Sequence, residues 1–148
     1  MRPARALLLV NGGTEPADSR RQHRVEYLLR EGLARLVAEE GITSLTGGTD
    51  AGLFSSFGDG LAIWKNKAAC IGVVVNQLVT WPGRVSDALP CNTSENSLEQ
   101  LEAHHTHFVL VDGKEWGDET PIMYELAAAL SHNQPSVAIF AGGGKITL

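Results

Sequence analysis

Short apolar runs alternate along the chain with longer stretches in which apolar residues recur at helical spacing. The runs are typical of β-strands, and the run at residues 69–75 is apolar throughout, as in a parallel sheet that is covered on both faces. We therefore expect five strands, which the pattern places at Ala6–Val10, Ile42–Leu45, Ala69–Val75, His107–Gly113 and Ser136–Gly144.

The longest amphipathic stretch runs from about Asp18 to Glu40 and predicts a helix. Its apolar side chains fall on one helical face, which consists of Val25, Leu28, Leu29, Leu33, Leu36 and Val37. Gly41 follows where a helix-ending glycine is common. The other segments are interpreted as a helix at residues 51–66, a loop at 76–96, a short helix at 98–104, and a helix from near Asp118 with Pro121 in its first turn.

Strands that alternate with helices imply right-handed crossovers and an open parallel sheet. The expected fold class is therefore α/β, a Rossmann-like open parallel sheet of about five or more strands with helices on both faces. A length of 148 residues suits one domain, residues 1–148. The sequence ends just after the fifth predicted strand, where this architecture would normally add a covering helix. We expect a domain that is truncated there, a minimal version of the fold, or one whose open face a partner covers.

Composition and net charge argue against some classes of binding partner. The chain is 43% hydrophobic and 20% charged, as in globular proteins, and its net charge of −5 argues against duplex DNA or RNA as the main partner. No apolar run is long enough to span a membrane, and the N-terminus lacks the features of a signal peptide, so we expect a cytoplasmic protein. Cys70 and Cys91 form no zinc or disulfide pattern, and Cys70 is expected in the core.

Glycine-rich segments follow the first two predicted strands. In open α/β sheets, ligands bind at the carboxyl ends of the strands. Gly12, Gly13 and Thr14 follow the first strand, and the second strand leads into "TGGTDAG", with Gly47, Gly48, Thr49, Asp50 and Gly52. Glycines allow positive φ angles and close approach of a ligand, and the N–H groups of a helix start suit a phosphate. The alternative is a glycine turn with a helix cap and no ligand.

Residue types in "TGGTDAG" suggest separate roles. Thr49 and Asp50 are good N-cap residues, so the helix is expected to start at this pair. Asp50 has the wrong charge for a phosphate, and it is better suited to cap the helix or to accept a hydrogen bond from a ribose hydroxyl.

A third candidate segment is "DGKEWGDE", after the fourth predicted strand. Trp116 could stack on a base or pack over the sheet edge. Gly117, Asp118 and Glu119 predict a helix start with acidic caps, and Glu119 and Glu125 are the carboxylates available for acid–base chemistry.

A histidine cluster and a glycine run offer weaker signals. His105 and His107 are expected to face the same way, but no third metal ligand is evident, so structural or surface roles are favoured over a metal site. The "GGGK" near the end lacks the upstream glycine and the following helix of a phosphate loop. We expect no metal and no cofactor.

Three segments together carry a resemblance to a known family: "TGGTDAG", "HTHFVLVDGKEWGDETPIMYELAAAL" and "PSVAIFAGGG". The chain resembles the SLOG superfamily, which includes the Smf/DprA proteins and the LOG nucleotide phosphoribohydrolases, and within it the prokaryotic LSDAT type, related to the N-terminal domain of TRPM channels. The resemblance implies a Rossmann-like fold that binds a nucleotide derivative such as ADP-ribose. It implies phosphate at Gly47, Gly48, Thr49 and Gly52, with Trp116 to Glu119 across the cleft.

Catalysis is less expected than binding. LOG enzymes carry "PGGxGTxxE" where this chain reads "DGKEWGDET". The leading hypothesis is thus a non-catalytic sensor of a small-molecule nucleotide derivative, with ribose hydroxyls donating to Asp50 or Asp118. The alternative is a nucleotide N-glycosidic hydrolase that uses Glu119 first and Glu125 second. A purely structural module is a third class. The family implies output through a homodimer or an effector partner.

Overall fold

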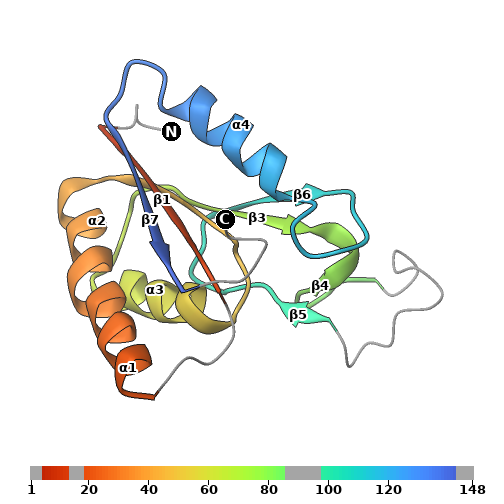
Figure 1. Cartoon of the computed structure of the whole chain (residues 1–148), viewed down its shortest axis with the longest axis horizontal. Coiled ribbons are helices and arrows are strands. Elements are labelled where there is room, and N and C mark those ends of the chain that lie inside the picture. Colours follow the sequence, from red (N-terminus) through yellow and green to blue (C-terminus); the bar gives the residue numbers. More distant parts are fainter. Residues whose placement is uncertain (1–4, 14–18, 86–97, 143–148) are drawn as a thin grey trace.

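The computed structural model describes residues 5–13, 19–85 and 98–142. Within them the main sheet has five strands in the order β6-β3-β2-β1-β7, and every pairing in it is parallel (Figure 1). Its strands are β1 Leu7–Gly12, β2 Thr43–Thr46, β3 Cys70–Val75, β6 His107–Val111 and β7 Ser136–Ala141. The expected α/β class and the five strands are confirmed. Thr14, Cys91 and the run from Gly143 onward lie outside the described residues.

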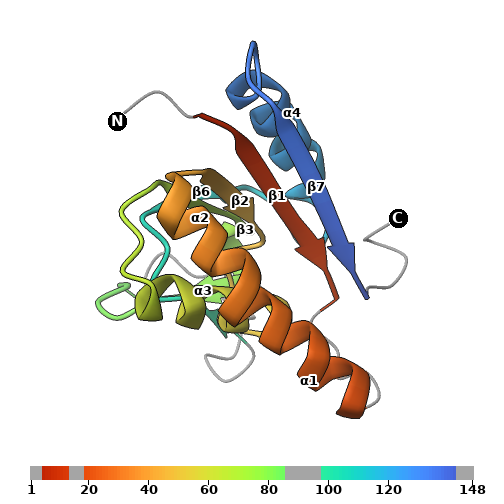
Figure 2. The same cartoon turned by 90° about the vertical axis from the view of Figure 1, so that its left-hand side faces the viewer.

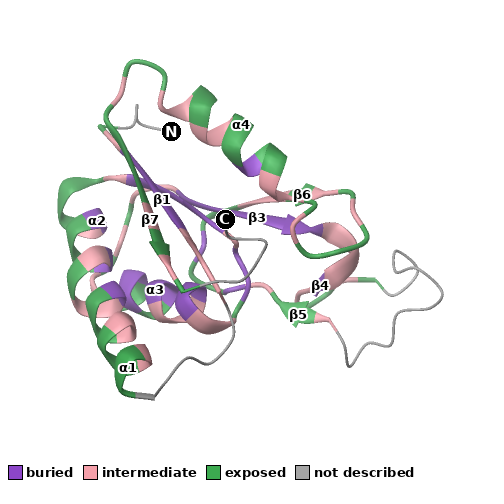
Figure 3. Ribbon diagram, viewed as in Figure 1, coloured by how far each residue is buried: buried purple, intermediate pink, exposed green. Residues whose placement is uncertain are grey.

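Helices cover both faces of the sheet, as expected. α1 (Ser19–Tyr27), α2 (Ala34–Glu40) and α3 (Gly52–Ile63) lie on one side, and α4 (Thr120–Leu130) lies on the other (Figure 2). Side chains alternate along β1, so Leu8 and Val10 pack under α1 to α3 while Leu7 and Leu9 pack against α4. The central strands β1, β2 and β3 are therefore the most completely buried part of the molecule (Figure 3).

The first predicted helix is continuous but not uniformly α-helical. Leu28–Leu33 (η1) forms a π-helical segment between α1 and α2. The wider turn shifts the residues that face the sheet. Leu29 and Val37 are buried, whereas Leu28 and Leu36, which the sequence pattern placed on the same face, are 65% and 48% exposed. Gly41 ends α2 in the left-handed conformation, at φ 67°, as predicted.

The segment after β3 carries a small second sheet. A 3-10 turn at Asn76–Leu78 (η2) leads to β4 (Val79–Thr80), which pairs with β5 (Glu99–Gln100). The short helix predicted for residues 98–104 is wrong. Leu101 pairs instead with Thr49 in an isolated antiparallel bridge, because backbone partners from two other segments satisfy this stretch in extended form.

Candidate functional site

The glycine-bearing ends of β1 and β2 lie side by side at the carboxyl edge of the sheet. β1 lies between β2 and β7, and Gly12 pairs in register with Ala141 of β7. From β1 the chain adds β2, β3 and β6 in turn on one side of β1. It then crosses back to add β7 on the other side, so the strand order reverses between β1 and β7. Such a reversal is where open α/β sheets bind ligands. Gly12 is tightly enclosed here, since a Cβ on it would lie 2.3 Å from Ala141 O and from Leu53 Cδ1.

We call residues Gly47–Gly52 the glycine loop. Gly48 is left-handed at φ 67°, and a Cβ on it would lie 2.8 Å from Gly72 Cα on β3. A Cβ on Gly47 would lie 2.6 Å from the ring of Phe54. Both glycines are thus required by packing, irrespective of any ligand. Gly52, at φ 51°, turns the chain into α3.

Several donors of the glycine loop are already engaged. Gly48 N–H donates to Thr46 Oγ1 over 2.9 Å, and Asp50 N–H donates to Gln100 O over 2.8 Å. The first-turn N–H groups of α3, at Gly52 and Leu53, have no partner within the helix because the residues four positions before them lie outside it. They lie at the carboxyl edge of the sheet.

The predicted N-caps of α3 are not caps. The N-cap position is Ala51, without a side-chain hydrogen bond. Thr49 is buried because its segment pairs with Leu101, and Asp50 precedes the cap with an exposed side chain. The capping role is therefore wrong for both residues, and Asp50 keeps a solvent-facing carboxylate beside the start of α3.

A buried series of side-chain hydrogen bonds connects the end of β2, next to the glycine loop, to the segment before β6. Thr46 Oγ1 lies 2.6 Å from His105 Nε2, and His105 Nδ1 lies 2.7 Å from Glu102 Oε2. An ionised carboxylate only accepts, so His105 Nδ1–H donates to Glu102, and His105 Nε2 shares the second hydrogen bond with the Thr46 hydroxyl. The other oxygen, Glu102 Oε1, lies 2.7 Å from His104 Nδ1. We call Thr46, His105 and Glu102 the relay.

Glu102 is charged and almost fully enclosed. Its burial raises the carboxyl pKa, but the hydrogen bonds from His105 and His104 outweigh burial, so the pKa lies below its usual value. Gly58 on α3 has no room for a Cβ, which would lie 2.1 Å from Glu102 Cδ. The relay therefore connects α3, the end of β2 and the segment before β6.

Sequence reasoning missed Thr46 and Glu102 and misplaced His105. The structural role favoured for the histidines fits His105, which is buried, but the two histidines do not share a strand face, because β6 starts at His107 and His105 precedes it. The available signal was a histidine and a glutamate three residues apart, in a segment that had been interpreted as helical.

The turn between β6 and α4 is held by its own carboxylates. Asp118 Oδ2 accepts N–H bonds from Lys114 at 2.7 Å and from Glu115 at 3.1 Å. These two bonds lower the pKa of the exposed Asp118 carboxyl. Glu119 Oε2 accepts from Gly117 N–H at 2.8 Å, and Gly117 has φ 109°. α4 begins at Thr120 with Pro121 in its first turn, two residues later than expected, because Asp118 caps the turn rather than the helix.

α4 connects this turn to the end of β1. Asn11 Nδ2 donates to the Tyr124 hydroxyl at 3.4 Å, so the start of α4 lies over the carboxyl end of β1. Trp116 is 40% exposed on the turn. Glu125, the second candidate carboxylate, is also exposed.

The described residues contain neither a metal-type cluster nor a membrane helix. Among residues 5–13, 19–85 and 98–142, no three His, Cys, Asp or Glu side chains are grouped to hold a metal ion. In the same ranges, no helix combines the length and the apolar character needed to cross a bilayer. Cys70 is a buried core thiol, as expected, and burial raises its pKa to about 12.

The family model described as "SLOG in TRPM, prokaryote" matches residues 5–148. The chain belongs to this family. The sequence-based resemblance is thus confirmed, and the domain is a ligand-binding SLOG fold. No curated protein sequence matches the chain significantly.

Solved structures similar to this SLOG domain show the same fold at low identity. The molybdenum cofactor binding protein of the phototrophic bacterium Rippkaea orientalis is 18% identical, with a TM-score of 0.59 over 99% of this chain and 67% of that protein. The protein TM1055 is 13% identical, with a TM-score of 0.59 over 96% and 64%. The Moco carrier protein of Chlamydomonas is 16% identical, with a TM-score of 0.50 over 93% and 77%. This SLOG chain spans about two thirds of the length of the first two.

Proposed function

We propose that this SLOG domain binds a phosphorylated nucleotide derivative, ADP-ribose-like, and does not turn it over. The observation that carries the proposal is the position of the α3 start. Its first-turn N–H groups at Gly52 and Leu53 follow β2, the Leu53 side chain borders Gly12 at the end of β1, where the strand order reverses, and the buried relay fixes the loop that leads to them. Backbone donors and the helix dipole there favour an anion without any nearby cation.

The neighbouring groups suit a ribose. The exposed Asp50 carboxylate beside the α3 start can accept from ribose hydroxyls, as the sequence suggested. Asp118 is less suited, because one of its oxygens already accepts two backbone N–H bonds. Gly12 and Gly13 border the same edge and complete the proposed cradle.

A binding role without catalysis fits two further observations. Glu119, the first candidate for acid–base chemistry, accepts a hydrogen bond from Gly117 N–H within its own turn. Two of the solved structures with this fold are named as a cofactor binding protein and a cofactor carrier protein, which favours binding without turnover. We propose that the effect of ligand binding is passed on through a homodimer or an effector partner.

Thermal melting with AMP, ADP-ribose, cyclic ADP-ribose, NAD and their guanine counterparts tests the proposal, with chromatography of each mixture afterwards. A ligand at a hundred times its dissociation constant adds about 2.7 kcal/mol of stability. We expect a shift with the ligand recovered intact. Release of a free base would instead establish a hydrolase, and no shift with any compound would overturn the binding role.

The Asp50→Ala variant tests the proposed ribose contact separately from the proposed phosphate site. We expect it to weaken binding of ADP-ribose while binding of inorganic pyrophosphate is unchanged, because pyrophosphate has no ribose hydroxyls. Glu26→Ala, on helix α1, is a control that removes one carboxylate outside the glycine loop. Equal loss of both ligands in Asp50→Ala would contradict the assigned ribose contact.

A further inference from the structure

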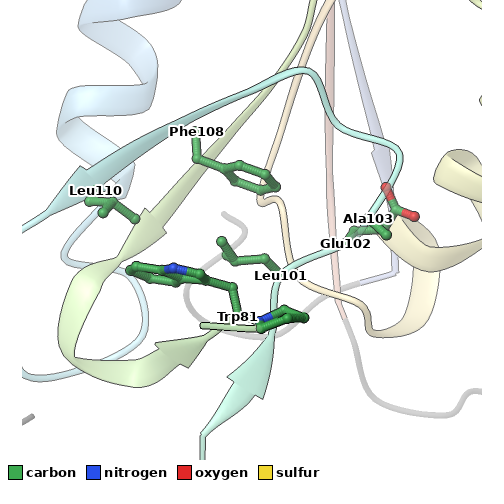
Figure 4. A pocket seen from close by; sticks show the side chains of 7 residues that line it. Trp81, Leu101, Glu102, Ala103, Phe108 and Leu110 are labelled. Atoms are coloured by element: carbon green, nitrogen blue, oxygen red, sulfur yellow. The ribbon is translucent and has the colours of Figure 1, made fainter. Parts of the chain in front are cut away.

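A hollow of about 340 Å³ lies over the β3–β6 side of the sheet, on the face that carries the glycine loop (Figure 4). None of the residues predicted from the sequence to bind ligand lines it. Its apolar walls are formed by Trp81, Pro82, Leu101, Ala103, Phe108 and Leu110. A volume of this size lies at the small end of the range for small-molecule sites.

The hollow adjoins the glycine loop through backbone pairing. Leu101 and Glu102 belong to its wall. Glu102 N–H donates to Gly48 O over 2.9 Å, and Leu101 is the bridge partner of Thr49. The paired segment is therefore shared by the glycine loop and the wall of the hollow.

Both aromatic rings of the hollow are held in place before any ligand binds. The Arg84 guanidinium lies 4.5 Å from the centre of the Trp81 ring. Arg84 is itself anchored, since it donates to Asn76 O at 2.7 Å, to Asn76 Oδ1 at 3.1 Å and to Val79 O. Phe108 stacks on His105 of the relay, with ring centres 5.6 Å apart. Rings fixed in advance lower the entropic cost of binding.

The chemistry of the walls suits a flat aromatic ring rather than a polar group. Figure 4 shows the Phe108 and Trp81 rings among the side chains that line the hollow, with Leu101 between them in this view. The carboxylate of Glu102 is already engaged by His104 and His105 and offers little to a ligand. Stacking on such rings tolerates any base, because every base has a π-face.

We propose that this hollow receives the heteroaromatic base of the ligand, so that the base stacks on Trp81 and not on Trp116. The inference rests on the proposed function, which puts the phosphate at the start of α3. Because the walls recognise shape and not hydrogen-bonding pattern, adenine and guanine derivatives bind with similar affinity.

Calorimetric titration of the Trp81→Leu variant tests the inference with three ligands: ADP-ribose, ribose 5-phosphate, which has no base, and adenosine, which has no phosphate. We expect Trp81→Leu to weaken ADP-ribose and adenosine at least about fivefold, the low end for base–aromatic stacking. Ribose 5-phosphate should be unaffected. Tyr27→Leu is the matched control, since it removes a 64% exposed ring on α1. Phe108→Leu replaces Trp81→Leu if the latter does not fold.

The outcomes separate this inference from the proposed function. If ADP-ribose binds Trp81→Leu normally and Trp116→Leu poorly, the base stacks on Trp116, and the inference fails while the proposed function stands. If adenosine binds through Trp81 and ribose 5-phosphate does not bind, the hollow is supported and the phosphate site is overturned. If neither ADP-ribose nor adenosine binds the wild-type chain, both fail.

Discussion

Thr46 and His105 are 59 residues apart in sequence and share a buried hydrogen bond of 2.6 Å. The bond joins the end of β2 to the segment before β6. Because Thr46 also accepts the N–H of Gly48, the histidine is connected to the glycine loop through Thr46. The relay is therefore a structural support of the candidate site, and its removal should affect stability and ligand binding together.

His105→Ala should lower the free energy of unfolding by about 3 kcal/mol, because it leaves the Glu102 carboxylate buried with one fewer partner. Urea unfolding measures this directly. His104→Ala is the control: His104 contacts the same carboxylate, but its side chain is 43% exposed, so a loss below about 1 kcal/mol is expected. Similar losses of unfolding free energy in both variants would mean that the buried contact contributes no more to stability than the exposed one.

Stability should fall at acidic pH through Glu102. A carboxyl whose pKa is lowered in the folded state stabilises the protein above its unfolded pKa, about 4.3. That contribution is lost progressively as the pH falls from there through the lower folded value. Urea unfolding between pH 7 and pH 3 should show a smaller acid loss for Glu102→Gln than for the wild type. If the free energy of unfolding fell equally with pH in both proteins, Glu102 would not be a source of acid sensitivity.

Gly48→Ala should be more destabilising than Gly41→Ala, although both glycines have φ 67°. A left-handed alanine costs about 1–2 kcal/mol at either position. At Gly41 a Cβ would meet nothing within 4 Å, whereas at Gly48 it would collide with the backbone of Gly72. We expect a further loss of about 1–3 kcal/mol from overpacking at Gly48 alone, measured by urea unfolding. Equal losses of stability in the two variants would show that β3 shifts at little cost to make room for the Cβ.

Glu119→Gln tests the hydrolase alternative. If the chain cleaved a nucleotide through this carboxylate, the variant would bind ligand and lose turnover by about a hundredfold or more. We expect instead no measurable turnover in either protein, with binding intact. Product analysis by chromatography decides between the two, and Glu125→Gln serves as the paired variant on the exposed side of α4.

Cys70 should resist thiol reagents in the folded protein. Its pKa of about 12 leaves almost no thiolate at pH 8, and the side chain is inaccessible. In a Cys91→Ser background, reaction with a disulfide reagent should be slow in buffer and rapid in urea. Rapid labelling of the folded chain would indicate that β3 opens locally.

The fold was predictable because its signals are local. The apolar run at 69–75 and the amphipathic stretch at 18–40 identify strand and helix by periodicity alone. The π-helical turn at Leu28–Leu33 was not visible, and Leu36, which follows it, lies at the surface. Periodicity assumes one helical pitch, so a single wider turn shifts every position after it.

The candidate site was less predictable because it depends on distant pairs. Glycine pairs after strands marked the carboxyl edge of the sheet. They did not reveal that Gly48 is required by Gly72, or that Asp50 N–H is engaged by Gln100. The hollow at Trp81 arises from three separate segments, and no spacing in the sequence brings them together.

The contact between Gly48 and Gly72 has a mechanical consequence. Where two backbones touch, no rotatable side chain lies between them to absorb a displacement, so the glycine loop and β3 move as one stiff body. A displacement of the loop is therefore passed to β3 without loss in a side chain. β3 pairs with β6, whose end leads into the turn before α4. The sheet itself thus connects the glycine loop to the turn that follows β6.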